Sequence, residues 1–202
     1  MLRFLVGVVL AGVLMHGWGM VSWMVLPFHE QTMKPITMDS PVVSSIRDLG
    51  IEEEGFYYFP PMPEDWSDEA QMEAYEAAHA EGPAAYLIVQ PNPGPPMPVA
   101  MIAVGFGSQL LAALLAGLVL ALGPGSGVCQ RYVGVVLMGA IVAVVADGAA
   151  WNWMLYPTDY SVVMGADRVA AFALGGVPLA LLPLRRGGLG VADKDSASQS
   201  EG

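Results

Sequence analysis

The sequence is poor in cysteine and in basic residues, and both shortages exclude classes of protein. Its one cysteine is Cys129, so no disulfide can frame a secreted-type domain. Its 8 Lys and Arg face 19 Asp and Glu, which leaves no basic surface to neutralise the phosphates of a nucleic acid. The glycine-rich motifs of nucleotide-binding proteins and of serine hydrolases are absent as well.

Charge of either sign is scarce outside one stretch. Charged residues make up only 13% of the chain and hydrophobic residues 54%, whereas soluble domains carry near a quarter charged residues. The net charge of −11 comes from residues 28–98, which hold 13 acidic and 2 basic residues, while the rest holds 6 of each. This distribution predicts an integral membrane protein with one acidic insert.

Four apolar runs are long enough to cross a bilayer, since about 20 residues of helix are required. None alternates in the manner of barrel strands. We therefore predict an all-α membrane protein with four transmembrane helices and a small α+β extracytoplasmic insert between the first two. The runs are Phe4–Leu26, Val99–Leu122, Tyr132–Trp151 and Val162–Leu184. The corresponding regions are residues 1–27 (first helix), 28–98 (acidic cap), 99–184 (helices two to four) and 185–202 (flexible cytoplasmic tail).

The first run has a second interpretation. Met1-Leu-Arg followed by apolar residues resembles a secretory signal peptide. The run continues to Leu26, however, and no small-residue cleavage motif follows it. We expect a retained helix, and cleavage remains the alternative.

The basic residues indicate an orientation. With four spans, five of the eight bases fall on one side, which the positive-inside rule assigns to the cytoplasm. The prediction is a multi-pass protein of the cell inner membrane with both termini cytoplasmic and residues 28–98 extracytoplasmic. The five bases are Arg3, Arg131, Arg185, Arg186 and Lys194.

The insert carries signals for two helices and two strands. Asp39-Ser40-Pro41 is a helix start and Gly50 a helix stop. An aromatic strand is expected at residues 55–60, a helix capped by Asp65 or Ser67 that runs to residue 80, and a second strand at 84–90. The Glu52–Glu54 run lacks a calcium-loop pattern, which favours a solvated surface.

Polar residues at membrane depth are the default functional candidates. His16 and Gln109 lie near the midpoints of their runs, so they could hydrogen-bond across helices. Asp147 and Arg168 each lie about five residues, roughly 7 Å, outward of a run centre, so they could form an ion pair, with Asp167 nearer water. For each candidate, a structural tie between helices competes with a ligand or proton role.

The predicted outer membrane boundary adds four candidates. His29 and Glu30 follow the first run as a metal or proton pair, although the H-E-x-x-H motif is missing and an interfacial histidine is the simpler interpretation. Trp151 and Trp153 suit the interface, where an indole is half buried. No metal site and no cofactor is predicted. A haem clamped by His16 and His29 is disfavoured because the two lie at different depths on one helix.

Three aromatic motifs carry a resemblance. They are Trp18…Trp23-Met-Val-Leu-Pro-Phe-His29, Gly55-Phe-Tyr-Tyr-Phe-Pro60 and Trp151-Asn-Trp-Met-Leu-Tyr-Pro157. Together they resemble a family of uncharacterised bacterial inner-membrane proteins. The resemblance covers most of residues 1–184 and implies four helices with an extracytoplasmic segment after the first. It implies no activity.

Three functions follow as hypotheses. The leading one is a non-enzymatic structural or accessory component that contacts the lipid bilayer and binds another membrane protein or a second copy of itself. The alternative is a small carrier or proton-coupled transporter that uses His16, Gln109, Asp147 and Arg168. An enzyme acting on a lipid or quinone would require a pocket that joins His29 and Glu30 to Asp147.

Overall fold

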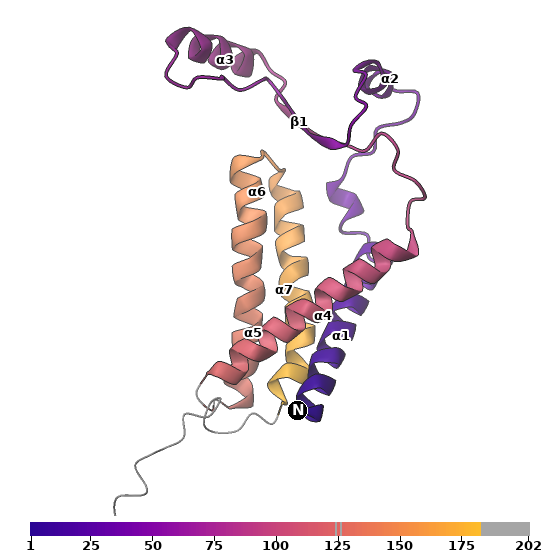
Figure 1. Ribbon diagram of the computed structural model, residues 1–202, viewed down its shortest axis with the longest axis vertical. Coiled ribbons are helices and arrows are strands. Elements are labelled where there is room, and N and C mark those ends of the chain that lie inside the picture. Colours follow the sequence, from indigo (N-terminus) through magenta and orange to yellow (C-terminus); the bar gives the residue numbers. More distant parts are fainter. Residues whose placement is uncertain (124, 126, 183–202) are drawn as a thin grey trace, which may run out of the picture. The chain divides into compact units, whose positions relative to one another are not determined.

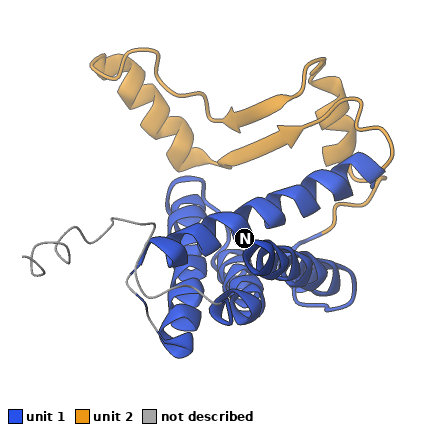
Figure 2. Ribbon diagram, turned by 60° about the horizontal axis from the view of Figure 1, so that its bottom comes forward, with its two compact units in different colours: residues 1–34, 97–202 blue, residues 35–96 orange. Residues whose placement is uncertain are grey.

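The computed structural model divides the chain into two compact units. One comprises residues 1–34 and 97 onward, and the other residues 35–96 (Figure 2). The structure describes residues 1–123, 125 and 127–182, so the expected tail at 185–202 lies outside the described residues. Residues 28–34, which the sequence assigned to the insert, group with the long helices.

Each of the four expected apolar runs contains a long helix, which confirms the main feature of the predicted fold. Each is long and apolar enough to cross a membrane. They are α1 (Leu2–Met24), α4 (Val99–Leu122), the continuous helix formed by α5 (Val128–Val142), η2 (Ala143–Asp147) and α6 (Gly148–Trp153), and α7 (Thr158–Ala180).

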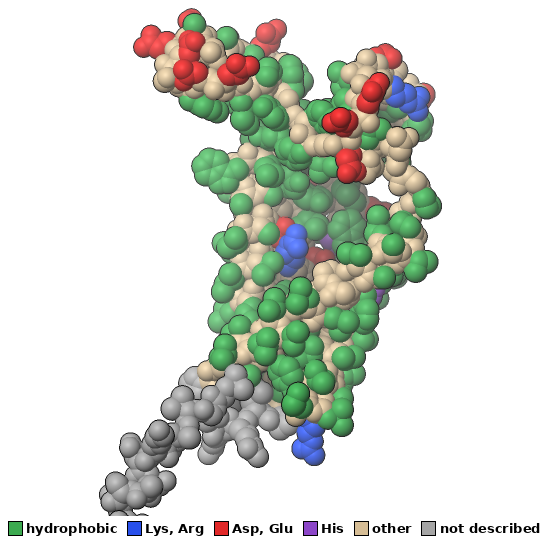
Figure 3. Space-filling view, in the orientation of Figure 1, with side chains coloured by type: hydrophobic (Ala, Val, Ile, Leu, Met, Phe, Trp, Pro, Cys, Tyr) green, Lys and Arg blue, Asp and Glu red, His purple; other side chains and the backbone are tan. Residues whose placement is uncertain are grey.

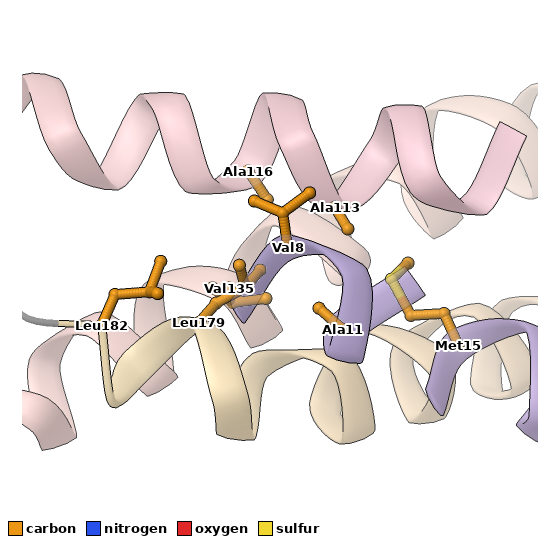
Figure 4. Packing of buried hydrophobic residues seen from close by; sticks show 8 residues of the cluster. All are labelled: Val8, Ala11, Met15, Ala113, Ala116, Val135, Leu179 and Leu182. Carbon is orange, nitrogen blue, oxygen red and sulfur yellow. The ribbon is translucent and has the colours of Figure 1, made fainter. Parts of the chain in front are cut away.

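Helix α7 has two principal neighbours in the helical unit. It packs against α5 on one side and α1 on the other, and α4 packs mainly on α1, which it crosses obliquely (Figure 1). The buried cluster lies where these helices meet (Figure 4). Its members are Val8, Ala11, Met15, Ala113, Ala116, Val135, Leu179 and Leu182.

Small residues allow the helices to approach closely. A Cβ atom added at Gly139 would lie 2.6 Å from Cβ of Phe172, so α5 and α7 meet there without room for a side chain. Helix α4 buries Ala113, Ala116 and Gly117. Between helices in a lipid bilayer the hydrophobic effect is absent, and close packing of this kind holds such helices together.

The outer surface of the helical unit is apolar. Val104 and Val144 are each 72% exposed, and hydrophobic side chains cover most of the visible face of these helices (Figure 3). Soluble proteins seldom expose apolar surface on this scale. The surface has the composition of one that contacts lipid.

The second unit is a small α/β arrangement. Its elements are α2 (Pro41–Asp48), β1 (Gly55–Phe59), α3 (Glu69–Glu81) and β2 (Ala85–Val89), in the order that the sequence predicted. The strands form a two-stranded antiparallel sheet in which Tyr57 pairs with Leu87. Ser40 caps α2 by accepting a hydrogen bond from the Val42 N–H. Gly50 ends the helix with a φ of +62°, which glycine adopts without strain.

The predicted cap of α3 was wrong. Asp68, rather than Asp65 or Ser67, accepts hydrogen bonds from the backbone N–H groups of Ala70 and Gln71. The helix begins later than expected, because Asp65 is engaged in its own turn and accepts hydrogen bonds from the N–H and hydroxyl of Ser67. Hydrogen bonds from Gln71 hold the pKa of Asp68 below its ordinary value.

Candidate functional site

Consecutive residues of α7 reach two different neighbours. Asp167 contacts α1, and Arg168 contacts η2. Successive residues of a helix point about 100° apart. Asp167 therefore reaches the neighbour on one side of α7 and Arg168 the neighbour on the other. On the face shown in Figure 3, a few acidic and basic side chains interrupt the hydrophobic surface of the long helices.

The predicted ion pair between Asp147 and Arg168 is confirmed. Nε of Arg168 donates a hydrogen bond of 2.7 Å to Oδ2 of Asp147. Asp147 is only 9% exposed, whereas the Arg168 side chain remains 39% exposed. A carboxylate buried to this extent is expensive unless it is paired, so the contact accounts for how Asp147 is tolerated.

Asp147 ends a π-helical turn that the sequence did not reveal. In η2 the N–H of Gly148 bonds to the carbonyl of Ala143, five residues earlier. Such a turn inserts one extra residue into the helix and rotates everything that follows it. The residues Ala143–Asp147 are ordinary helix formers, and no composition signal marks the turn. Single π-turns occur frequently at functional sites.

Asp167 has two aromatic partners. Nε1 of Trp18 donates a 2.8 Å hydrogen bond to its Oδ1, and Nε2 of His29 lies 3.8 Å from its Oδ2. The Asp167 side chain is only 13% exposed. Trp18 and His29 cover the Asp167 carboxylate.

His29 is buried within the protein. It is 1% exposed, its ring stacks on Trp23 at 4.1 Å and 9°, and Phe28 packs on it at 4.6 Å. The expected pairing with Glu30 is not observed: Glu30 is exposed and begins the short helix η1 (Glu30–Thr32). In the sequence, Trp18 and Trp23 stand out only as members of an aromatic motif, and nothing there indicates their contacts with Asp167 and His29.

His16 and Gln109 are not hydrogen-bonded in the described part of the chain. The His16 ring packs edge-on against Phe106, with 5.3 Å between the ring centres. Phe106 lies one helical turn before Gln109, so α4 presents an aromatic ring to the histidine in place of the amide. Both residues are half-buried.

A groove runs between the third long helix and α7. Its volume is about 470 Å³, and it lies beside the ion pair. Asp147 lines this groove. Trp151, which is 50% exposed, also lines it and donates a 3.0 Å hydrogen bond from Nε1 to the Thr158 hydroxyl. The Ser161 hydroxyl is buried without a hydrogen-bond partner. The remaining lining residues are small or aliphatic: Ala140, Ala143, Val144, Gly148, Val162, Gly165, Ala166 and Val169.

These groups are suited to hydrogen bonding within an apolar site. Within the described ranges, no three His, Cys, Asp or Glu side chains gather as metal ligands. Trp153, another of the candidates drawn from the sequence, is 75% exposed. In comparisons with known proteins, the chain matches no family model, no curated sequence and no solved structure.

Proposed function

We propose that this protein is a structural or accessory component of a membrane, that its four long helices cross the bilayer, and that it binds another membrane protein or a second copy of itself. One observation carries the proposal: the buried charges are used in contacts between helices. Asp147 pairs with Arg168 across η2 and α7. Asp167 of α7 meets Trp18 of α1 and His29, which precedes η1. Groups used in this way hold a bundle together.

The apolar outer surface supports the membrane location. Helix α1 supplies Val8, Ala11 and Met15 to the buried cluster, which favours its retention in the mature protein. The placement of the acidic unit outside and the termini inside rests on the distribution of the basic residues. Membership of the uncharacterised inner-membrane family rests on the three aromatic motifs.

Cysteine labelling tests the topology. Cys129 is exposed at the start of α5, and Ala77 is exposed on α3. A membrane-impermeant maleimide added to intact spheroplasts should miss Cys129 until the membrane is opened. It should label Ala77→Cys in a Cys129→Ala background at once. The reverse pattern would overturn the orientation, and release of the protein by alkaline carbonate would overturn the membrane location.

Crosslinking in native membranes tests the accessory role. We expect a discrete larger species, either a dimer or a complex with one other membrane protein. A chain that stays monomeric at crosslinker concentrations that capture a known membrane dimer contradicts the role. Purification in mild detergent followed by mass measurement separates the dimer from the complex.

The polar residues on α7 keep the carrier alternative in consideration. Arg168 is paired with Asp147, yet its side chain is 39% exposed, and a carrier would require this pair to open during transport. A proton-coupled carrier predicts a pH change inside dye-loaded proteoliposomes that disappears in Asp147→Asn. Absence of any such signal with the parent protein, or an equal signal in the variant, leaves the accessory role.

A further inference from the structure

The groove beside the ion pair has the features of a small-molecule site. Ligand sites typically enclose 300–1,000 Å³ and combine mostly apolar walls with a few polar groups. This groove, at about 470 Å³, has small and aliphatic walls and two polar groups with unused capacity, Asp147 and Ser161. It runs beside about eleven residues of each helix, which makes it about 16 Å long.

The two polar groups define the chemistry of a head group. Oδ2 of Asp147 is engaged by Arg168, so Oδ1 remains as an acceptor. The Ser161 hydroxyl has no partner and can donate once it rotates about its Cα–Cβ bond toward the groove. A Cβ atom at Gly165, one turn from Ser161, would lie 3.8 Å from Asp147 Oδ2, so the two groups lie about one helical turn apart.

A hydroxyl group fits both positions at once. It donates to the Asp147 carboxylate and accepts from the Ser161 hydroxyl. Arg168 already neutralises the charge of Asp147, so an ammonium group would add an uncompensated positive charge to an apolar groove. A second carboxylate would be repelled by Asp147. The apolar walls then accommodate a hydrocarbon chain that follows the groove.

We propose that this groove binds an uncharged lipid alcohol, with its hydroxyl between Asp147 and Ser161 and its chain along the small residues. The inference rests on the proposed membrane location and adds a ligand class to it. A transmembrane helix of a partner fits less well, because a helix is about 10 Å across and the groove is too small to enclose one.

Photolabelling in phosphatidylcholine vesicles tests this proposal. The probe is hexadecanol with a diazirine in its chain and a terminal alkyne, compared with the same chain lacking the hydroxyl. Mass spectrometry then locates the labelled peptides. We expect labels in residues 140–169, with a preference for the alcohol of about tenfold, the effect of one hydrogen bond to a charged group.

Two glycines give a matched pair of variants. Gly148 lines the groove, Gly107 lies on α4 away from it, and an added Cβ meets nothing within 4 Å at either position. Gly148→Leu should abolish most of the preferential labelling, whereas Gly107→Leu should leave it unchanged. Ser161→Ala should lower the preference for the alcohol while retaining the chain contacts.

Three results would overturn the inference, and none of them affects the membrane location. Equal labelling by alcohol and hydrocarbon would make the groove ordinary lipid-facing surface. Labelling unchanged in Gly148→Leu would place the probe elsewhere. If labelling decreases as a crosslinked dimer forms, the groove is occupied by a second copy of the chain and not by a lipid alcohol. Release of the protein from vesicles by carbonate, measured separately, would contradict the proposed function itself.

Discussion

Nε of Arg168 lies 2.7 Å from Oδ2 of Asp147, while the preceding residue, Asp167, accepts a hydrogen bond from Trp18. Two adjacent positions of α7 therefore tie it to the helices on both sides. The ties differ in kind: one is an ion pair beside an open groove, and the other is a carboxylate covered by aromatic rings. The two should respond differently to substitution.

The ion pair should show strong coupling. Asp147→Asn leaves the Arg168 guanidinium without its carboxylate, and Arg168→Gln leaves a carboxylate that is 9% exposed without its cation. Each single change should lower thermal stability in detergent, and the double variant should recover part of the loss. Because the Arg168 side chain is 39% exposed, solvent screening reduces the coupling to about 1 kcal/mol. Losses that simply add in the double variant would show that the contact contributes nothing.

The hydrogen bond between α7 and α1 at Asp167 is donated by the indole N–H of Trp18. Trp18→Phe keeps an aromatic ring but removes the donor to Asp167, which is only 13% exposed. Leaving that carboxylate without the bond should cost about 1–2 kcal/mol. Trp151→Phe is the matched control, because it removes an indole bond to an exposed threonine and should change stability by less than about 0.5 kcal/mol. Equal effects of the two variants would contradict the importance of the Asp167 contact.

The sequence predicted those features that depend on regular periodicity. Runs of apolar residues located the four helices, and Asp147 and Arg168 could be matched in depth because a helix rises by a constant amount per residue. Predicting this ion pair required only that the two residues have equal depth and opposite charge. Counting residues from the centre of each run was therefore sufficient. The strands and helices of the second unit followed from equally local signals, such as the proline after Ser40.

Features that depend on rotation about a helix axis could not be predicted. His16 and Gln109 were expected at one level, yet α4 turns Phe106 toward the histidine. His29 was expected beside Glu30 because they are neighbours in sequence, but the chain folds the ring between Trp23 and Phe28. The π-turn before Gly148 also changes the rotation of α6 without any mark in composition. The depth of a residue follows from its position along one helix. The direction in which its side chain points depends on how all the helices of the unit pack.

Helix α3 should depend on the ionised form of Asp68. Hydrogen bonds from Gln71 and Ala70 lower its pKa, so its contribution to helix stability is present above the ordinary aspartate pKa. It is lost as the pH falls through the lowered value. Carboxyl-carbon NMR of labelled aspartate should show that the pKa of Asp68 lies below the ordinary aspartate value. Asp68→Ala should accelerate amide exchange in the first turn of α3, and Asp68→Asn, which retains the acceptor, should do so less.

Close packing of α5 on α7 gives the last prediction. A Cβ at position 139 would meet Cβ of Phe172 at 2.6 Å and its Cγ at 2.9 Å. A side chain cannot swing its own Cβ aside, so Gly139→Ala must push the two helices apart, which should cost about 1–3 kcal/mol of stability. Gly107→Ala makes the same change where an added Cβ meets nothing within 4 Å, and its better helix propensity should leave stability equal or slightly higher. Thermal unfolding of both variants in the same detergent measures the difference. A Gly139→Ala protein as stable as the Gly107→Ala protein would mean that α5 and α7 do not meet as closely as these distances require.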